Sequence, residues 1–376
     1  SLYLKNEFNR RHIMVGPDVW MDTESNPDFI EDPALYRAWR EQAATEGLRV
    51  RIGRWNVPGK PTAILVDFKQ FLTQQNEILT NFWKKFGVDS LTGNWDYRES
   101  ALFGYAAGRV IESFYNYNLD STSKVVAQFH EWMTGTGLLY LKSVNVPVAT
   151  VFTTHATVIG RCIAGNHLPL YDGLLGYNAD EKARQFNVVA RHSLEKKAAQ
   201  NSDIFTTVSE ITAQECRQFL GRPVDVVTPN GFEPSFTPAT DEEYEALRAR
   251  ARQKLVSVAS AMCGENVPEN AVLIGIGGRY EWKNKGIDVF IDALDKINHT
   301  DFKGKSVHAF IMIPSGHNGP DKQLLAKLAG NGSNYVTRTS HYLMNPEYDN
   351  ITRRLGELHL NNAAGDKVKV YFIPSY

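Results

Sequence analysis

The chain has 376 residues, of which 43% are hydrophobic and 22% are charged, a composition typical of two globular domains with sizeable cores. Its 41 Lys and Arg residues nearly balance 42 Asp and Glu residues, so no global field draws in nucleic acid or an anionic membrane. Three scattered cysteines are too few for a disulfide framework or a zinc site. The sequence shows neither a secretory signal nor an apolar run of about 20 residues, and we expect a cytoplasmic protein.

Strand-like and helix-like segments alternate along the first part of the chain, a pattern that predicts an α/β fold with a parallel sheet covered on both faces. Residues 99–115 carry apolar side chains at helical spacing and predict a helix. We expect residues 1–232 to form the first domain. The predicted strands, each short and rich in Val, Ile or Phe, are 12–16, 48–55, 62–68, 124–129, 147–152, 203–208 and 224–228.

The composition of the sequence changes after Gly231. Residues 241–256 are charged and have little apolar stripe, so we interpret 233–270 as a linker or helical insertion. A second alternating unit, 271–376, has its strands at 271–278, 307–314 and 367–374. Three strands are few, because a sheet usually has about five or six. Since the first residue is also not Met, we expect a piece of a longer protein with an incomplete second domain.

Residues 278–286 read GRYEWKNKG and join the predicted strand 271–278 to a segment with apolar residues at helical spacing. A helix N-terminus favours anions, and glycines let the backbone approach a phosphate closely. Arg279 adds a planar fork and Lys285 a point charge, which together fit one diphosphate. The alternative is that both cations are solvated loop residues.

Polar side chains follow the other predicted strands at the edge where open α/β sheets hold their ligands. His130 and Glu131 follow strand 124–129, and His155 follows strand 147–152. Each has a structural alternative: His155 as a satisfied interior histidine and Glu131 as a partner of a nearby basic residue. Ser209 and Asn230 follow two further strands. The structural alternative to a site role is a helix N-cap for Ser209 and a turn for Asn230.

Several stretches stand out in order along the chain: DYRESALFG (96–104), HEW (130–132), FTTHATVIGR (152–161), FTTVSEITAQE (205–215), VTPNG (227–231), GRYEWKNKG (278–286) and ITRRLGELHLNNAAGDKVKVYF (351–372). Together they resemble the glycogen synthases of the animal and fungal type. The resemblance implies the GT-B architecture, in which two Rossmann-like domains face a cleft. Residues 1–232 would be the N-terminal, acceptor-side domain without its first strand, and 271–376 the start of the nucleotide-sugar-binding domain.

The resemblance implies transfer of glucose from UDP-glucose to the non-reducing end of an α-1,4-glucan, with retention of configuration. It leaves ADP-glucose open as the donor, requires no cofactor or metal, and implies a homo-oligomer. Arg279 and Lys285 match the pair that binds the diphosphate and stabilises departing UDP, and His155 matches a histidine near the donor glucose. The positions that match the lining of the cleft are Glu131, Arg161, Asn230 and Gly278.

A second hypothesis is a catalytically incomplete GT-B protein that binds glucan or nucleotide. The family's Lys-x-Gly-Gly loop has no counterpart before strand 12–16, and its loop with two glutamates has none after strand 367–374. On this basis we expect the 376 residues alone to be inactive. A phosphorylase on the same architecture finds no support in the sequence.

Overall fold

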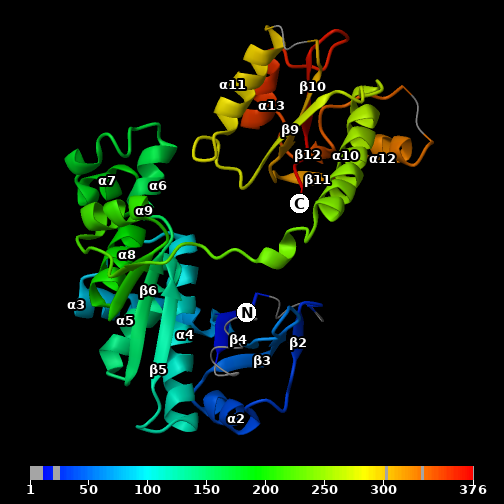
Figure 1. Ribbon diagram of the computed structural model, residues 1–376. Helices are drawn as coiled ribbons and strands as arrows, with labels where there is room; N and C mark the ends of the chain where they lie inside the picture. The colour runs from blue at the N-terminus through cyan, green and yellow to red at the C-terminus, as the bar shows by residue number, and fades with distance from the viewer. Residues whose placement is uncertain (1–11, 20–25, 301–303, 332–333, 376) are drawn as a thin grey trace. The chain divides into compact units, whose positions relative to one another are not determined.

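The computed structural model describes residues 12–19, 26–300, 304–331 and 334–375 (Figure 1). The chain divides into two compact units. The first unit comprises Ser1–Ile163 and Pro169–Asn230, and the second comprises Ala164–Leu168 and Gly231–Tyr376.

The first sheet of unit 1 is mixed rather than parallel. Its order is β1 (Ile13–Pro17), β4 (Thr62–Asp67), β3 (Arg49–Trp55) and β2 (Phe29–Glu31). Strand β1 runs parallel to β4, whereas β3 is antiparallel to both of its neighbours. The expectation of a parallel sheet is wrong here because the connection 56–61 is too short for a crossover and allows only an antiparallel pair.

The second sheet of unit 1 is parallel throughout, as predicted. Its order is β5 (Val125–His130), β6 (Val148–Thr154), β7 (Ile204–Thr207) and β8 (Val226–Val227). Helices connect most neighbours, because parallel strands require a crossover. The carboxyl ends of the strands therefore meet at one edge, and the polar residues that follow them in the sequence are brought together.

Helix α4 (Trp95–Asn118) lies between the two sheets of unit 1 (Figure 1). Its buried side chains join a single core with residues of both sheets, including Ile52 and Phe152. Helix α4 packs closely on α5 (Glu131–Val144) because glycines face the contact. A Cβ atom on Gly104 would lie 2.3 Å from Thr136 Oγ1, and one on Gly137 would lie 2.6 Å from the Gly104 carbonyl oxygen.

Shorter helices close the core of unit 1 around these elements. Helix α8 packs on α5 and helix α2 on β3 and α4. Ser209 caps α9, since its Oγ accepts a hydrogen bond from Thr212 N at 3.1 Å, which confirms the capping alternative. The helices are α2 (Arg37–Thr45), η1 (Lys69–Gln74), α3 (Gln75–Phe86), α6 (Val158–Gly165), η2 (Leu174–Gly176), α7 (Ala179–Gln185), α8 (Val189–Asn201), α9 (Glu210–Glu215) and η3 (Cys216–Leu220).

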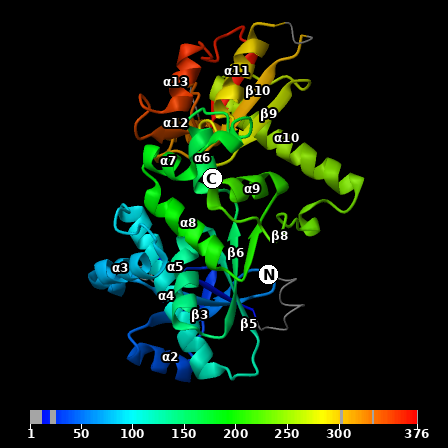
Figure 2. The same cartoon turned by 90° about the vertical axis from the view of Figure 1, so that its left-hand side faces the viewer.

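Unit 2 is built on a parallel sheet whose order in the described residues is β13 (Val368–Phe372), β10 (Val307–Met312) and β9 (Val272–Gly277). All three strands are predicted by the sequence. Figures 1 and 2 show helices on both faces. Helices α11 (Ile287–Asn298) and α13 (Asn350–Glu357) pack on one face, and α10 (Asp241–Cys263) and α12 (Lys322–Leu328) on the other. The remaining elements are η4 (Pro234–Phe236) and the antiparallel pair β11 (His317–Pro320) and β12 (His341–Leu343).

Helix α10 revises the interpretation of 233–270 as a linker or insertion. Its first turns, up to Arg250, are exposed, but Ala259 and Met262 are fully buried against Phe310 and Tyr371 of the sheet. The buried residues lie in the second half of the helix, beyond the charged stretch 241–256. The unit begins at Gly231 rather than at 271. Among the described residues, no helix has the length and apolar content needed to cross a bilayer.

Candidate functional site

Two histidines are in contact at the carboxyl edge of the second sheet. His130 Nδ1 lies 3.2 Å from His155 Nε2, so one ring donates a hydrogen bond to the other. The pKa of His130 lies below its ordinary value, because the ring is partly desolvated and because a charge on His155 would repel its own. His130 therefore favours its neutral form more than an exposed histidine does.

Glu131 connects this pair to the backbone. It is the first residue of α5 and adopts a φ of 63°, a left-handed conformation that is unusual for a residue with a side chain. Its Oε1 accepts a hydrogen bond from the backbone N–H of His155 at 3.0 Å. The structure thus places two of the predicted site residues, Glu131 and His155, in direct contact. It adds His130, whose contact the sequence does not reveal.

Arg161 and Asn230 are placed differently. Arg161 lies half-buried on α6, and Asn230 is exposed at the end of unit 1. Within the described parts of the chain, neither side chain shares a hydrogen bond or ion pair with His130, Glu131 or His155. Their assignment to the site remains a prediction.

A fully buried carboxyl group lies beneath the turn that carries His155. Glu195 on α8 has an exposed fraction of 0%. Its Oε1 is 2.8 Å from Thr154 Oγ1, and its Oε2 accepts from Val158 N at 3.0 Å. Burial raises the pKa of Glu195 to about 8, the carboxylates of Glu131 and Glu215 add to that rise, and the two hydrogen bonds oppose it.

A second buried carboxyl group holds the next part of the same segment. Glu215 on α9 accepts from the hydroxyl of Thr157 at 2.7 Å and from the hydroxyl of Tyr171 at 2.9 Å. Gly160 is required beside it, because a Cβ atom there would lie 2.1 Å from Glu215 Oε2. Neither glutamate was predicted from the sequence as a site residue. A usable signal for Glu195 is its place on α8 beside Leu194 and Ala198, which are buried as well.

The loop GRYEWKNKG in unit 2 presents its cations to solvent. Gly278 has a φ of 153°, a backbone conformation that favours glycine. Arg279 has an exposed side-chain fraction of 61%, and its Nη2 lies 3.0 Å from Glu281 Oε1. Lys285 is exposed, and no ion pair or side-chain hydrogen bond joins it to another described residue. Lys283, by contrast, is paired with Asp288.

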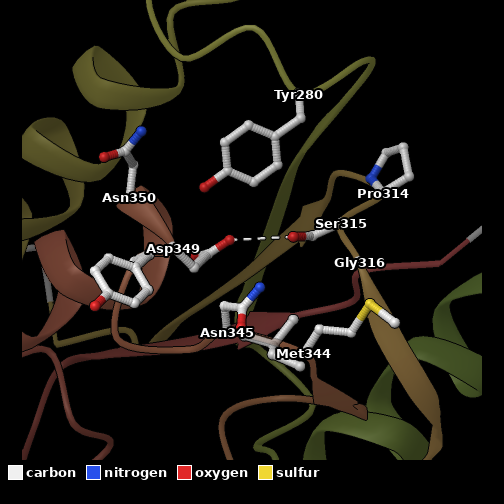
Figure 3. A pocket seen from close by; sticks show the side chains of 10 residues that line it. Tyr280, Pro314, Ser315, Gly316, Met344, Asn345, Asp349 and Asn350 are labelled. Carbon is white, nitrogen blue, oxygen red and sulfur yellow. Dashed lines mark hydrogen bonds between the residues drawn. The ribbon is translucent and has the colours of Figure 1, made fainter.

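A pocket of about 450 Å³ adjoins this loop. The Tyr280 hydroxyl accepts a hydrogen bond from Ile351 N at 3.2 Å, which ties the loop to the start of α13. Across the pocket, the Ser315 hydroxyl donates to Asp349 Oδ2 at 3.2 Å (Figure 3). The pocket is lined by residues that follow β9 and β10 and by the segment from the end of β12 to the N-terminus of α13, so it lies beyond the carboxyl edge of this sheet.

Comparison with known proteins identifies the family of the chain. The family model described as glycogen synthase matches residues 4–327. The chain belongs to the glycogen synthase family. The chain is similar to glycogen [starch] synthase of Neurospora crassa, with 32% identity over 82% of the chain. It is also similar to glycogen [starch] synthase isoform 2 of Saccharomyces cerevisiae, with 33% identity over 73% of the chain. The liver enzyme of Rattus norvegicus is 29% identical over 83% of the chain.

The aligned regions cover 44%, 39% and 45% of these three relatives, so this glycogen synthase family member spans less than half of their length. Among solved structures, a UDP-forming α,α-trehalose-phosphate synthase from Burkholderia vietnamiensis aligns with a TM-score of 0.50 and 13% identity. That alignment covers 97% of the chain and 73% of the other protein. This likeness concerns the fold, which is of the GT-B class.

Proposed function

We propose that the protein that carries this chain is a glycogen synthase, which transfers glucose from a nucleotide sugar to the non-reducing end of an α-1,4-glucan. The observation that carries the proposal is the loop GRYEWKNKG. It combines an exposed Arg279, a Lys285 without a described partner, and the N-terminus of a 12-residue helix. Membership of the glycogen synthase family supports the same activity.

The chemistry of the transfer explains why these groups are needed. The bond between the anomeric carbon and the diphosphate breaks, and negative charge grows on the departing nucleotide. Fixed positive groups stabilise that charge in the transition state more than in the ground state. The acceptor hydroxyl forms the new bond, and its proton passes to the leaving phosphate oxygen. In this proposal Arg279 contacts the diphosphate with two parallel hydrogen bonds and Lys285 with a point charge.

The groups of unit 1 suit the sugar rather than the phosphates. His155 and Glu131 are half-buried and already joined by a hydrogen bond. A carboxylate beside the anomeric centre would stabilise an oxocarbenium-like sugar, whereas it would repel a diphosphate. We therefore assign Glu131 and His155 to the glucosyl group, and Arg161 and Asn230 to its surroundings as the resemblance implies.

The pocket beside Tyr280 suits the nucleoside. The Asp349 carboxylate contacts it directly and disfavours a phosphate there. The same carboxylate and the amides of Asn345 and Asn350 offer acceptors for ribose hydroxyls and for N–H groups of a base. Uridine is the nucleoside that we propose, with UDP-glucose as the donor and ADP-glucose as its competitor in the test.

The proposed reaction requires no metal. Two cationic side chains and the amides at the start of α11 supply the positive charge that a divalent ion would otherwise bring. We expect turnover to stay within about twofold when a chelator is added to the full-length gene product. Loss of activity by a factor of about one hundred on chelation, restored by a divalent ion, would reject the metal-free reaction.

Purified full-length gene product incubated with labelled UDP-glucose and glycogen tests the proposed function. We expect label in the polysaccharide, released by an exo-acting α-glucosidase, and UDP as the second product. ADP-glucose in a parallel reaction measures the donor preference. Glycogen or UDP binding without incorporation would instead identify the catalytically incomplete binding protein. In keeping with the family resemblance, we also propose a cytoplasmic homo-oligomer, which fractionation and light scattering check.

A further inference from the structure

The turn from Thr154 to Val158 is hydrogen-bonded to the buried carboxyl group of Glu195, which has no part in the proposed chemistry. Glu195 contacts the turn at both ends, with Oε1 at 2.8 Å from Thr154 Oγ1 and Oε2 at 3.0 Å from Val158 N. His155 lies between these two contacts. Any change at Glu195 is therefore transmitted to the position of His155.

The surroundings of Glu195 favour a neutral acid. Its exposed fraction is 0%, and no ion pair joins it to another described residue. The charged groups that act on it most are carboxylates, Glu131 from α5 and Glu215 from α9. The thiols of Cys162 on α6 and Cys216 on η3 are also close enough to sense its charge. An ionised Glu195 would be buried without a cation, which costs free energy.

The hydrogen bonds of the turn are complete when Glu195 carries a proton. Its O–H group then donates to Thr154 Oγ1, and its other oxygen accepts from Val158 N. The Thr154 hydroxyl keeps its own hydrogen for the carbonyl oxygen of Ala156, which lies 3.5 Å away. That bond spans His155. An ionised Glu195 would take the Thr154 hydrogen for itself, and the bond across His155 would be lost.

We propose that Glu195 is a positioning residue that acts in its protonated form and holds His155 and its contact with Glu131 in place. Loss of its proton releases the turn and lowers the rate of glucose transfer. This inference rests on the proposed function, because His155 acts there on the glucosyl group. Burial raises the pKa of Glu195 to about 8, so the transition falls within an accessible range of pH.

Variants of the full-length gene product test this inference. Glu195→Gln is neutral at every pH and keeps the shape of the protonated acid, whereas Glu195→Ala removes both contacts. Glu181→Gln, on the exposed surface of α7, is the matched control. Steady-state kcat and KM for the donor would be measured from pH 6.5 to 9.5, with folding checked by thermal melting.

We expect kcat of the unchanged protein and of Glu181→Gln to fall as the pH rises through about 8. Glu195→Gln should stay within about threefold at pH 6.5 and lose this alkaline limb. Glu195→Ala should lose at least about tenfold in kcat with a smaller change in KM. An alkaline limb that persists in Glu195→Gln, or equal losses in the Gln and Ala variants, would overturn the proposal. If Glu195→Ala does not fold, the pH profile of Glu195→Gln decides alone.

A second measurement separates this inference from the proposed function. If the unchanged protein transfers no glucose, the function fails, but amide exchange in the peptide that contains 154–158 still tests the positioning. We expect faster exchange in the unchanged protein than in Glu195→Gln at pH 9 and equal exchange at pH 6.5. Equal exchange at both pH values would reject the role of Glu195 as well.

Discussion

The strand ends of unit 1 and the loop GRYEWKNKG of unit 2 prepare for a ligand in opposite ways. In unit 1, Glu131 and His155 are half-buried and already hydrogen-bonded. In unit 2, Arg279 and Lys285 are exposed, and one solvent-screened ion pair with Glu281 is all that engages Arg279 among the described residues. The groups that we assign to the sugar are thus fixed in advance, whereas the groups that we assign to the diphosphate remain hydrated.

The difference follows from the cost of burying charge. Two cations held together without an anion would repel each other and lose their hydration, so they are tolerated only at the surface. A group that already has a hydrogen-bond partner, such as Glu131 with the backbone N–H of His155, can be half-buried at a smaller cost. Substitutions in the loop should therefore change activity with little effect on stability, and substitutions beneath the unit 1 turn should change both.

The largest effect is expected for the loop cations. Lys285→Ala in the full-length gene product should lower turnover by about a hundredfold to a thousandfold, as is typical when one preorganised charge on a leaving group is removed. Arg279→Ala should behave alike, and Arg279→Lys should also be poor because a point charge lacks the planar fork. Steady-state kinetics measures the turnover of each variant, and urea unfolding measures its stability.

The free energy of unfolding should change by no more than about 0.5 kcal/mol in these variants, since both side chains are exposed. Lys296→Ala, in the last turn of α11, is the matched control and should leave turnover within about twofold. The double variant should lose less than the product of the single losses, because both cations act on one diphosphate. Turnover near that of the unchanged protein in both single variants would remove the loop from the site.

The next largest effect is a dependence of stability on pH. The pKa of Glu195 rises from its ordinary 4.5 to about 8 in the folded chain. Between these values the unfolded chain has lost the proton and the folded chain keeps it, so the free energy of unfolding falls as the pH rises from about 4.5 to about 8. Glu195→Gln lacks this contribution.

Relative to the unchanged protein, Glu195→Gln should therefore gain on the order of a few kcal/mol between pH 5 and pH 8. Urea unfolding at pH 5, 6.5 and 8 measures the difference, and Glu181→Gln should follow the unchanged protein throughout. Parallel curves for the unchanged protein and Glu195→Gln would show that the buried acid titrates normally.

Gly160 tests how tightly the segment beside the unit 1 site is packed, because a larger side chain there would clash. A Cβ atom at this position would lie 2.1 Å from Glu215 Oε2 and 2.7 Å from Thr157 Oγ1. Since both neighbours are buried, Gly160→Ala should cost about 1–3 kcal/mol of unfolding free energy. Gly356→Ala is the matched control in α13, where a Cβ atom meets nothing within 4 Å. It should be neutral or slightly stabilising, and equal melting temperatures for the two variants would contradict the crowding at Gly160.

The smallest effect is expected for the tie between the loop and α13. Tyr280→Phe removes the hydroxyl that accepts from Ile351 N at 3.2 Å. One lost hydrogen bond corresponds to about 1 kcal/mol, and turnover should fall by no more than about tenfold. Tyr244 is exposed on α10, and Tyr244→Phe should change neither stability nor turnover. A Tyr280→Phe variant with unchanged stability and turnover would mean that the loop does not depend on α13.

The main strands of both units were predictable because short runs of Val, Ile and Phe between helical stretches have few other readings. The family motifs also located Glu131 and His155, which the structure joins by a hydrogen bond. The antiparallel pairing of β3 with β4 differs from the prediction because the connection 56–61 is too short for a crossover between parallel strands. The roles in the site of all seven residues stay predictions, namely Glu131, His155, Arg161, Asn230, Gly278, Arg279 and Lys285.

The contacts of the buried acids were not predictable from the same patterns. Glu195 is hydrogen-bonded to Thr154, which lies 41 positions away in the sequence, and Glu215 to Thr157, which lies 58 positions away. The Tyr280 hydroxyl finds its partner 71 positions away. Such contacts arise from the tertiary fold, and no local spacing encodes them.

The left-handed conformation of Glu131 has a consequence for how this protein could be improved. A residue with a side chain at a φ of 63° is held there at a cost of about 1–3 kcal/mol. Glycine would relieve that cost but would lose the contact with His155. Selection for thermostability alone should therefore enrich Glu131→Gly, whereas selection for activity should purge it, so a library screened under both conditions would mark this position as one where stability and activity are opposed.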